Sequence, residues 1–385
     1  MNIATFTIIA ISLFIAMLSH GLVMPLLPLY ATSLGANSLE LGFIAAGSSF
    51  ASLFLMPFIG AWSDRYGRKI FICIALFLTP IAILLMSLAT STTDLIVLRC
   101  LQGIAMSMLF PTTQALLADM IPPGQEGKWM GYFNMAVWGG LGLGPVIGGA
   151  INDLLNMAAV FYITSAVMFL SFLVALIFLS EPPRSNTKTQ KKLSGIRGSL
   201  QNKTLRNIAV LQLVLGLGMG ASLVFLPILG NINLALTTTM IGIILAVRTP
   251  ISMIQSWTGK MADRWGALRL IIIGGALNVI AFVLLPWSIG FWTLLIFHAL
   301  LSLGTALTQP AIAVYVVKEG RFSGMGSAMS ISMMATQLGM GIGPILMGRI
   351  TDYSTISIGF NSIAGLSLIG LILFAWNMHK HHPTD

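Results

Sequence analysis

The chain has 385 residues, of which 56% are hydrophobic and 8% are charged, and its mean hydropathy is +0.92. A soluble globular domain carries about 25% charged residues, so this composition excludes a soluble protein and predicts an all-α membrane protein. The formal net charge is +9. We interpret this charge as a determinant of membrane topology and of contact with anionic lipid, and we expect no nucleic-acid partner.

Apolar windows of about 20 residues predict twelve transmembrane helices. They cover residues 4–30, 39–61, 70–89, 94–118, 129–152, 157–180, 206–229, 237–258, 268–286, 290–314, 323–348 and 357–378. The first window is far longer than the apolar core of a signal peptide, about 7–15 residues, so we expect a retained helix. The polar stretch 181–205 separates residues 1–180 from residues 206–385, which predicts two six-helix bundles joined by a cytoplasmic linker.

The basic residues predict the orientation of these helices. With a cytoplasmic N-terminus, 17 Lys and Arg residues of the loops and tail lie on the cytoplasmic face, and only Arg349 lies on the other. Basic loops resist translocation across the membrane. We therefore expect a multi-pass protein of the cell (inner) membrane with both termini in the cytoplasm.

Landmarks along the chain recur after 199 residues. The corresponding pairs include Gly21 and Gly220, Pro28 and Pro227, Asp64 and Asp263, and Gly144 and Gly343. We expect this register to hold without a gap, as in a tandem duplication. Two related membrane bundles are typical of secondary transporters.

The loop after the second span is densely charged and reads Gly60-Ala61-Trp62-Ser63-Asp64-Arg65-Tyr66-Gly67-Arg68-Lys69. A carboxylate at the end of one helix stabilises the positive N-terminal end of another, so we predict a cytoplasmic gate here. A plain topology signal would explain the basic residues but not the recurrence of the acid. The predicted gate consists of Gly60, Asp64, Arg65, Gly67, Arg68, Lys69, Asp119, Asp263 and Arg264.

Glycines at every fourth position mark the fifth span, and a similar set marks its copy in the eleventh. Such glycines form a ridge without side chains that lets a neighbouring helix approach, and an internal proline lets the helix bend. We predict a hinge or sliding surface, with ordinary tight packing as the alternative. The predicted hinge motif consists of Gly140, Gly144, Pro145, Gly148, Gly149, Gly339, Gly343 and Pro344.

Four basic side chains lie inside the predicted spans and away from their cytoplasmic ends, whereas the eleven acidic residues all lie in loops or at helix ends. A charge at this depth is costly and tends to face a bundle interior, so we predict a shared substrate site. Hydrogen bonding to backbone carbonyls is the alternative for the arginines, snorkelling a further one for Arg99, and simple packing the alternative for the histidines. The predicted substrate-binding residues are His20, Arg99, Gln102, Gln114, Asn134, Trp138, Arg248, His298 and Gln337.

Together these motifs resemble those of the major facilitator superfamily. The Gly60–Lys69 loop resembles its cytoplasmic signature, Leu98–Gly103 its fourth-helix motif, and Gly140–Gly149 its fifth-helix antiporter motif. The segment Gly21–Pro28 is similar to the first helix of the twelve-span drug/proton antiporter group. The resemblance implies two pseudo-symmetric bundles of six helices, in which spans one, four, eight and ten border a central cavity and spans three, six, nine and twelve lie outside it.

The resemblance also implies partners for the charged loops. Asp64 is expected to face the start of span eleven, and Asp263 the start of span five. Arg68 is expected to pair with Asp119. Members that export cationic drugs carry a carboxylate within the helices, and this chain has none near the middle of a predicted span. This departure favours anionic, zwitterionic or neutral amphipathic cargo.

We therefore predict a secondary active transporter that exports small amphipathic or anionic molecules by alternating access, driven by the proton-motive force. The alternatives are uptake of an anionic metabolite by the same fold and a membrane receptor that does not transport. The expected partners are a small-molecule substrate, the lipid bilayer and protons. The candidate proton carriers are His20 or His298, with Glu40, Asp64 and Asp119 nearer the membrane faces as the alternative. We expect a monomer. No nucleophile pairs with a base and no phosphate-binding loop is present, so we expect no enzyme activity, catalytic residue, cofactor or metal.

Overall fold

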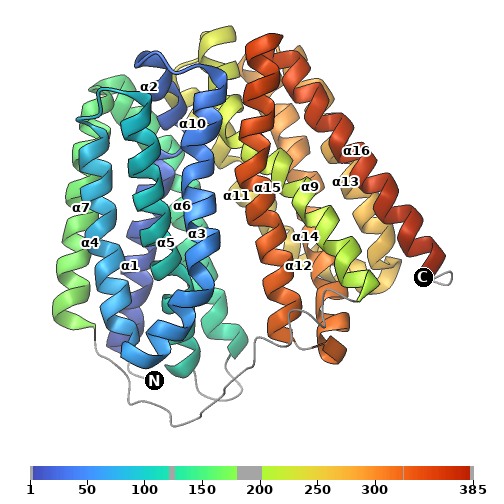
Figure 1. Ribbon diagram of the computed structural model, residues 1–385, viewed down its shortest axis with the longest axis horizontal. Coiled ribbons are helices and arrows are strands. Elements are labelled where there is room, and N and C mark those ends of the chain that lie inside the picture. Colours follow the sequence, from blue (N-terminus) through green and yellow to red (C-terminus); the bar gives the residue numbers. More distant parts are fainter. Residues whose placement is uncertain (1–2, 121–125, 180–201, 324, 382–385) are drawn as a thin grey trace. The chain divides into compact units, whose positions relative to one another are not determined.

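The computed structural model describes residues 3–120, 126–179, 202–323 and 325–381, and every regular element in these ranges is a helix (Figure 1). The first half contains α1 (Ile3–Val23), α2 (Leu27–Ser33), α3 (Ser38–Tyr66), α4 (Arg68–Met86), α5 (Thr92–Met120), α6 (Glu126–Leu154) and α7 (Met157–Phe178). The second half contains α9 (Lys203–Ile228), the π-helix η1 (Leu229–Asn233), α10 (Thr238–Ala246), α11 (Arg248–Met253), α12 (Gln255–Trp265), α13 (Ala267–Leu284), the 3₁₀ helix η2 (Leu285–Trp287), α14 (Phe291–Ser323), α15 (Met325–Tyr353) and α16 (Ile356–His381).

Within the described residues, eleven helices are long and apolar enough to cross a membrane. A twelfth apolar stretch, Thr238–Met253, is shorter because span eight is interrupted. This finding confirms an all-α membrane protein and agrees with the twelve predicted spans. The predicted end of span ten at residue 314 is wrong, because α14 continues to Ser323 and takes in Lys318 and Glu319. Polar residues can extend a helix beyond the apolar window, since its backbone hydrogen bonds continue there.

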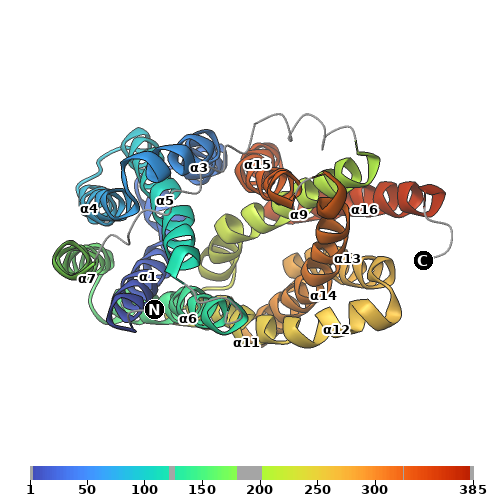
Figure 2. The same cartoon turned by 90° about the horizontal axis from the view of Figure 1, so that it is seen from below.

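The chain divides into two compact units. The first contains residues 1–36, 43–187 and 237–246, and the second contains residues 37–42, 188–236 and 247–385. In the first unit, α1 packs against α6 and α7, and α4 packs against α5 and α7. In the second, α9 packs against α15 and α16, and α13 packs against α14 and α16. Figure 2 shows α1 beside α6 and, separately, α9 beside α15. Both units therefore use the same internal packing, as a duplicated bundle should.

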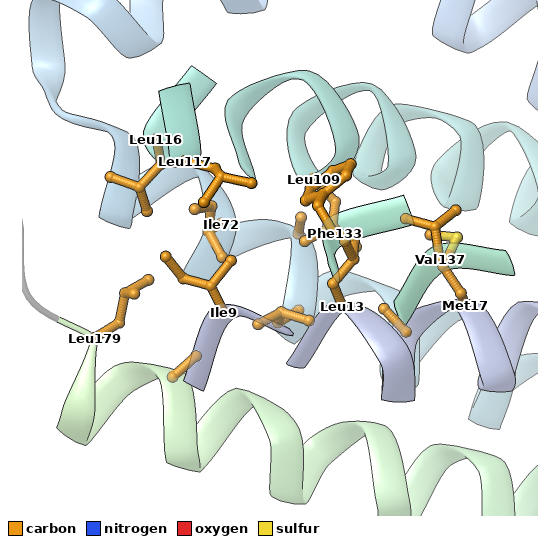
Figure 3. Close-up of a cluster of buried hydrophobic side chains, with 14 of the residues drawn as sticks. Ile9, Leu13, Met17, Ile72, Leu109, Leu116, Leu117, Phe133, Val137 and Leu179 are labelled. Atoms are coloured by element: carbon orange, nitrogen blue, oxygen red, sulfur yellow. The ribbon is translucent and has the colours of Figure 1, made fainter. Parts of the chain in front are cut away.

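The core of the first unit is an interdigitated set of large apolar side chains (Figure 3). Leu13 of α1, Leu109 of α5 and Phe133 of α6 are each 1% exposed. An equivalent cluster in the second unit is centred on Leu270, Ile312 and neighbouring residues. Lipid chains are as apolar as these side chains, so close packing, rather than removal of apolar surface from water, stabilises the bundle.

Each unit also contains the start of a helix from the other half of the sequence. In the first unit, the N–H groups of Thr238 and Thr239 donate to the carboxylate of Asp153, at 3.1 and 2.8 Å. In the second, the N–H groups of Ser38 and Leu39 donate to the carboxylate of Asp352, at 2.8 and 3.0 Å. The first N–H groups of a helix have no partner within the helix, so each carboxylate caps its helix and interacts favourably with the helix dipole.

The repeat slips by one residue over residues 35–48, where equivalent positions lie 200 residues apart. Gly35 and Ala235 both have positive φ, 87° and 51°, and Ser38 and Thr238 both begin a helix. The π-helix η1 lies just before this stretch in the second half, and its i→i−5 hydrogen bonds hold one more residue per turn than an α-helix. The prediction of a register without a gap is therefore wrong here. The 199-residue register returns by Gly60 and Gly259, after the interrupted part of span eight.

The slip changes which residues correspond. Ser48 of α3 is equivalent to Arg248 of α11, whereas Arg99 remains equivalent to His298. The two halves thus place the arginine within their spans on different helices.

The glycines of the predicted hinge motif lie in direct contact with neighbouring backbone. A Cβ atom added at Gly140 would lie 2.5 Å from the carbonyl oxygen of Phe14, and one at Gly144 would lie 2.6 Å from the backbone of Gly21. In the second unit, a Cβ atom at Gly339 would lie 2.8 Å from the backbone nitrogen of Leu217. Only glycine permits these close approaches. Both α6 and α15 remain continuous through their internal prolines, and movement at this surface stays a prediction.

Candidate functional site

A cavity lies within the second unit and takes up about 630 Å³ together with its opening. Its apolar wall is formed by Leu215, Met219, Phe282 and Leu301. Its polar side chains include Arg248, Asn278, His298 and Gln309, and none of the described residues that line it is acidic.

Arg248 reaches this cavity from an interrupted helix. It is the first residue of α11, directly after the break at Val247 that ends α10. Pro250 has no N–H group to donate to the carbonyl of Ala246, which favours an interruption at this point. The Nη2 atom of Arg248 lies 3.7 Å from the sulfur of Met219. Sulfur is a weak acceptor, and within the described part of the chain Arg248 has no carboxylate partner.

His298 and Asn278 bring further unpaired polar atoms to the cavity. His298 is 5% exposed and Asn278 is 3% exposed. Among the described residues, neither ring nitrogen of His298 has a hydrogen-bond partner, and neither does Oδ1 of Asn278. Buried polar atoms are normally hydrogen-bonded, so unpaired ones beside a cavity indicate a place for water or a ligand.

Hydroxyl groups line the rest of the cavity and are already engaged with their own helices. Ser302 donates to the carbonyl of His298 at 2.9 Å, and Thr305 donates to the carbonyl of Leu301 at 3.0 Å. Thr308 donates to the carbonyl of Gly304 at 2.7 Å. These bonds satisfy the hydroxyl hydrogens and leave oxygen lone pairs toward the cavity. The hydroxyl groups therefore add polarity without charge.

Arg99 of the first unit has a different environment. It is 2% exposed, and its Nε donates to the carbonyl of Ile44 at 3.3 Å. Its two terminal nitrogens donate to Oε1 of Gln102 at 2.5 Å and to Oγ of Ser48 at 2.8 Å. Charge-assisted hydrogen bonds of this kind solvate a guanidinium group in place of water. Both Arg99 and Gln102 thus have partners within the first unit.

The structure does not bring the other predicted substrate residues into the cavity. Gln114, Asn134 and Trp138 are exposed residues of the first unit. His20 is partly buried in the first unit, where its Nδ1 has no partner. Gln337 is partly buried in the second unit but does not line the cavity.

Sequence reasoning missed Asn278 and Phe282 of α13 and Ser367 of α16, which all line the cavity. The resemblance placed spans nine and twelve outside a central cavity, and no cavity-lining role was expected for them. One signal was available: Asn278 is the single amide side chain in the apolar helix α13. An amide in such a segment needs a polar partner.

The predicted cytoplasmic gate lies partly outside the described residues, which do not include the side chains of Gly60, Asp64, Asp119 and Asp263. Their pairings stay predictions. Arg65 and Arg264 are exposed at the ends of α3 and α12. Gly67 and Gly266 precede α4 and α13 with φ of 106° and 88°, a backbone conformation that favours glycine. The recurrence of these two glycines therefore has a local backbone cause.

Comparison with known proteins identifies the class. The family model of the Major Facilitator Superfamily matches residues 9–254 and 208–385. The quinolone resistance protein NorA of Staphylococcus aureus strain MSSA476 is 26% identical over 371 residues, which cover 94% of this chain and 93% of that protein. An uncharacterized transporter of the same class from Methanocaldococcus jannaschii is 27% identical over 377 residues, covering 95% and 96%.

Solved structures share the fold. The nucleoside transporter NupG has a TM-score of 0.83 at 15% identity, covering 98% of this chain and 99% of that one. A bacterial homologue of the lysosomal transporter Spinster, in an inward-facing and unoccupied conformation, has a TM-score of 0.82 at 13% identity, covering 98% and 96%. The chain belongs to the Major Facilitator Superfamily and resembles its drug/proton antiporter group. It is a multi-pass membrane protein of a family of secondary transporters, and family and fold point to transport, not to enzyme activity.

Proposed function

We propose that this protein exports small amphipathic or anionic molecules by alternating access, driven by the proton-motive force. The observation that carries the proposal is the cavity of the second unit, where Arg248, His298 and Asn278 present polar atoms without protein partners. An apolar wall with a few convergent polar groups is typical of small-molecule sites. In a family of transporters, such a site is a place to hold cargo.

The direction of transport is proposed from the relatives. NorA is named as a quinolone resistance protein, and the match covers nearly the full length of both chains. Removal of a drug from the cell is the direct way for a membrane transporter to give resistance. We therefore propose export, with quinolone-type acids as the first compounds to test.

Proton coupling is proposed to use histidine. Among the described residues that line the cavity, none is acidic, whereas His298 has two unpaired ring nitrogens. Histidine can gain and lose a proton in the physiological range. His20 of the first unit, with its unpaired Nδ1, is the second candidate.

The membrane orientation is proposed from the distribution of charge. Residues 1–180 and 206–385 are proposed to form the two bundles of a monomer, with both termini and residues 181–205 in the cytoplasm. Single cysteines introduced at Asn37, Asp153 and Asn233 should react with an impermeant thiol reagent in intact cells, whereas one at Ser194 should not. The reverse labelling would overturn this topology.

Flux into liposomes tests the proposed transport. The purified protein is reconstituted in vesicles with an acidic interior, and accumulation of nalidixic acid, a quinolone carboxylate, is measured. Accumulation should exceed that of protein-free vesicles, which report passive distribution of the weak acid, and a protonophore should abolish the excess. A panel of anionic, neutral and cationic aromatic compounds extends the assay. Equal accumulation with and without protein for the entire panel would exclude the proposed function.

Uptake of an anionic metabolite is the second candidate, because the positive charge of Arg248 lies in the cavity without a counterion. The same vesicles separate the candidates. A proton-coupled exporter accumulates cargo in vesicles with an acidic interior, because protons leave as cargo enters. A proton-coupled importer accumulates cargo only when protons and cargo enter together.

A further inference from the structure

We propose that the cavity of the second unit binds an oxoanion, and that Arg248 holds the carboxylate, phosphonate or sulfonate group of an amphipathic cargo. The inference rests on the proposed function, because it names the chemical class of the cargo. It is argued from the balance of charge and hydrogen bonds around Arg248.

A guanidinium group has five N–H donors and is always charged. Arg248 uses one terminal nitrogen for a contact with the sulfur of Met219, and the described residues that line the cavity supply no acid. Arg248 is partly buried, and among the described residues it has neither a counterion nor an oxygen acceptor, which is unfavourable in a medium of low dielectric constant. An anion in the cavity would supply both.

Arg99 shows what a purely structural arginine looks like in the same chain. A backbone carbonyl, an amide oxygen and a hydroxyl group accept from it. The equivalent of Ser48 in the second unit is Arg248 itself, and the equivalent of Gln102 is Leu301. The second unit thus has a cation and an apolar side chain at the positions of two of these acceptors, and the one hydrogen-bond contact described for Arg248 is with a sulfur atom.

The remaining lining gives the shape of the cargo. A neutral imidazole offers one donor and one acceptor, so His298 can donate to a second oxygen of the anion. Oδ1 of Asn278 can accept from a hydroxyl or N–H group of the cargo. Phe282, Leu215 and Leu301 form an apolar wall that suits an aromatic body. The cavity thus fits an aromatic or aliphatic acid that carries a neighbouring hydrogen-bond donor.

The place of Arg248 in the chain links this site to movement. The boundary between the two compact units falls between Ala246 and Val247, and Arg248 begins the helical segment that follows. An anion bound to Arg248 would therefore contact the chain directly beside the interruption of span eight, where a change in the bend of this span would begin.

Binding is tested on the full-length purified protein in nanodiscs of phosphatidylcholine, without transport. Benzoate, phenylphosphonate and benzenesulfonate are titrated while the melting temperature is measured, with benzamide as the neutral control of the same size. At least one of the three anions should raise the melting temperature in proportion to its concentration, and benzamide should not. The relative strength of benzoate and phenylphosphonate reports which oxoanion the cavity prefers.

Substitutions locate the site. Arg248→Lys keeps the charge but loses the parallel N–H donors of the guanidinium group, and should weaken anion binding several-fold. Arg248→Gln should weaken it about 10- to 100-fold, as expected for loss of a charge-assisted hydrogen bond. Arg349→Gln is the matched control, because Arg349 is an exposed arginine of the same unit that lies over the ring of Tyr353. It should bind anions as the natural protein does.

Equal stabilisation by benzoate and benzamide would overturn the inference, and so would unchanged anion affinity in folded Arg248→Gln. A third contrary result is stabilisation through Arg248 by phosphatidylglycerol nanodiscs without any added anion. This result would show that Arg248 binds lipid headgroups. If Arg248→Gln does not fold, the comparison of benzoate with benzamide on the natural protein and on Arg248→Lys decides. Anion binding without flux would contradict the proposed transport and support the anion site. Flux of a neutral cargo without anion binding would support the proposed transport and contradict the anion site.

Discussion

Each unit has an arginine within a predicted span, and the two arginines differ in their surroundings: Arg99 is buried, whereas Arg248 is partly buried beside a cavity. In the first, Arg99 is surrounded by three oxygen acceptors from α3 and α5. In the second, Arg248 faces a cavity with a sulfur atom as its hydrogen-bond partner. The two bundles are similar in their packing, yet the hydrogen bonds described for their arginines differ. This difference is why the binding site is proposed at Arg248 and not at Arg99.

Removing each arginine tests this comparison and should give the largest effect. Arg99→Leu leaves Oε1 of the buried Gln102 without its described donor, at a cost of about 1–3 kcal/mol. It also removes a donor from the carbonyl of Ile44 and from Oγ of Ser48, which keeps its own bond to the carbonyl of Ala45. Arg248→Leu leaves no oxygen acceptor unpaired and removes an uncompensated charge, so its melting temperature should equal or exceed that of the natural protein. Melting curves in detergent compare the two variants. Equal destabilisation would show that Arg248 is structural as well.

Methyl groups on the glycine ridge should give the next largest effect. In Gly144→Ala, the Cβ atom would lie 2.6 Å from the backbone of Gly21, so α1 and α6 must separate. Overpacking of this kind costs about 1–3 kcal/mol. Gly339→Ala makes the equivalent change in the second unit and should destabilise to a similar extent.

Gly131→Ala is the control for this series, because a Cβ atom at Gly131 of α6 has no neighbour within 4 Å. It should leave the melting temperature unchanged or raise it slightly, since alanine is the better helix former. A drop in all three variants would trace the effect to the helices themselves and not to their contacts.

The capping carboxylates should give a smaller and unequal effect. Asp153 accepts from two backbone N–H groups and from the hydroxyl groups of Thr238 and Thr239, whereas the hydrogen bonds described for Asp352 come from two backbone N–H groups. Loss of a helix cap costs about 0.5–2 kcal/mol, and exposure to solvent lowers this. Asp153→Asn should therefore lower the melting temperature more than Asp352→Asn. The opposite order would show that the hydroxyl contacts add no stability.

Much of the fold could be predicted from the sequence, because membrane-spanning helices depend on the average hydrophobicity of long segments and not on single contacts. Composition and apolar windows predict the spans, and recurring landmarks such as Asp64 and Asp263 predict the duplication. The one-residue slip was not predictable, since the extra residue has no distinctive chemistry and is absorbed by backbone hydrogen bonds in η1. Whether a given arginine has acceptors depends on residues distant in sequence, such as Ile44 and Ser48 for Arg99.

The candidate site was predictable only in part. Arg248 and His298 stand out as basic residues within apolar spans, and the structure places both beside one cavity. Arg99 and Gln102 stand out equally by sequence, yet they satisfy each other. Asn278 was missed because its helix was expected to lie outside the central cavity.

Removing the proline at the interruption of span eight should have the smallest effect on stability. It tests whether this interruption, which α3 of the first half lacks, matters for function. The equivalent of Pro250 is Phe50 by the 200-residue register and Ala51 by the 199-residue register, and both lie in the uninterrupted helix α3. Pro250→Ala restores an N–H group that can donate to the carbonyl of Ala246, while the rest of the chain is unchanged. The free energy of unfolding should change by about 1 kcal/mol or less, because the gain in helix formation is offset by a more flexible unfolded chain.

Function should respond more than stability does. If the interruption is needed for span eight to bend, Pro250→Ala should slow flux in liposomes at equal anion affinity, and hydrogen exchange of the amides between Val247 and Ile251 should slow with it. The hydrogen bond from Ile251 to Val247 is long, 3.5 Å, so this turn has room to tighten. Unchanged flux together with slowed exchange would show that the break places Arg248 beside the cavity but does not serve movement.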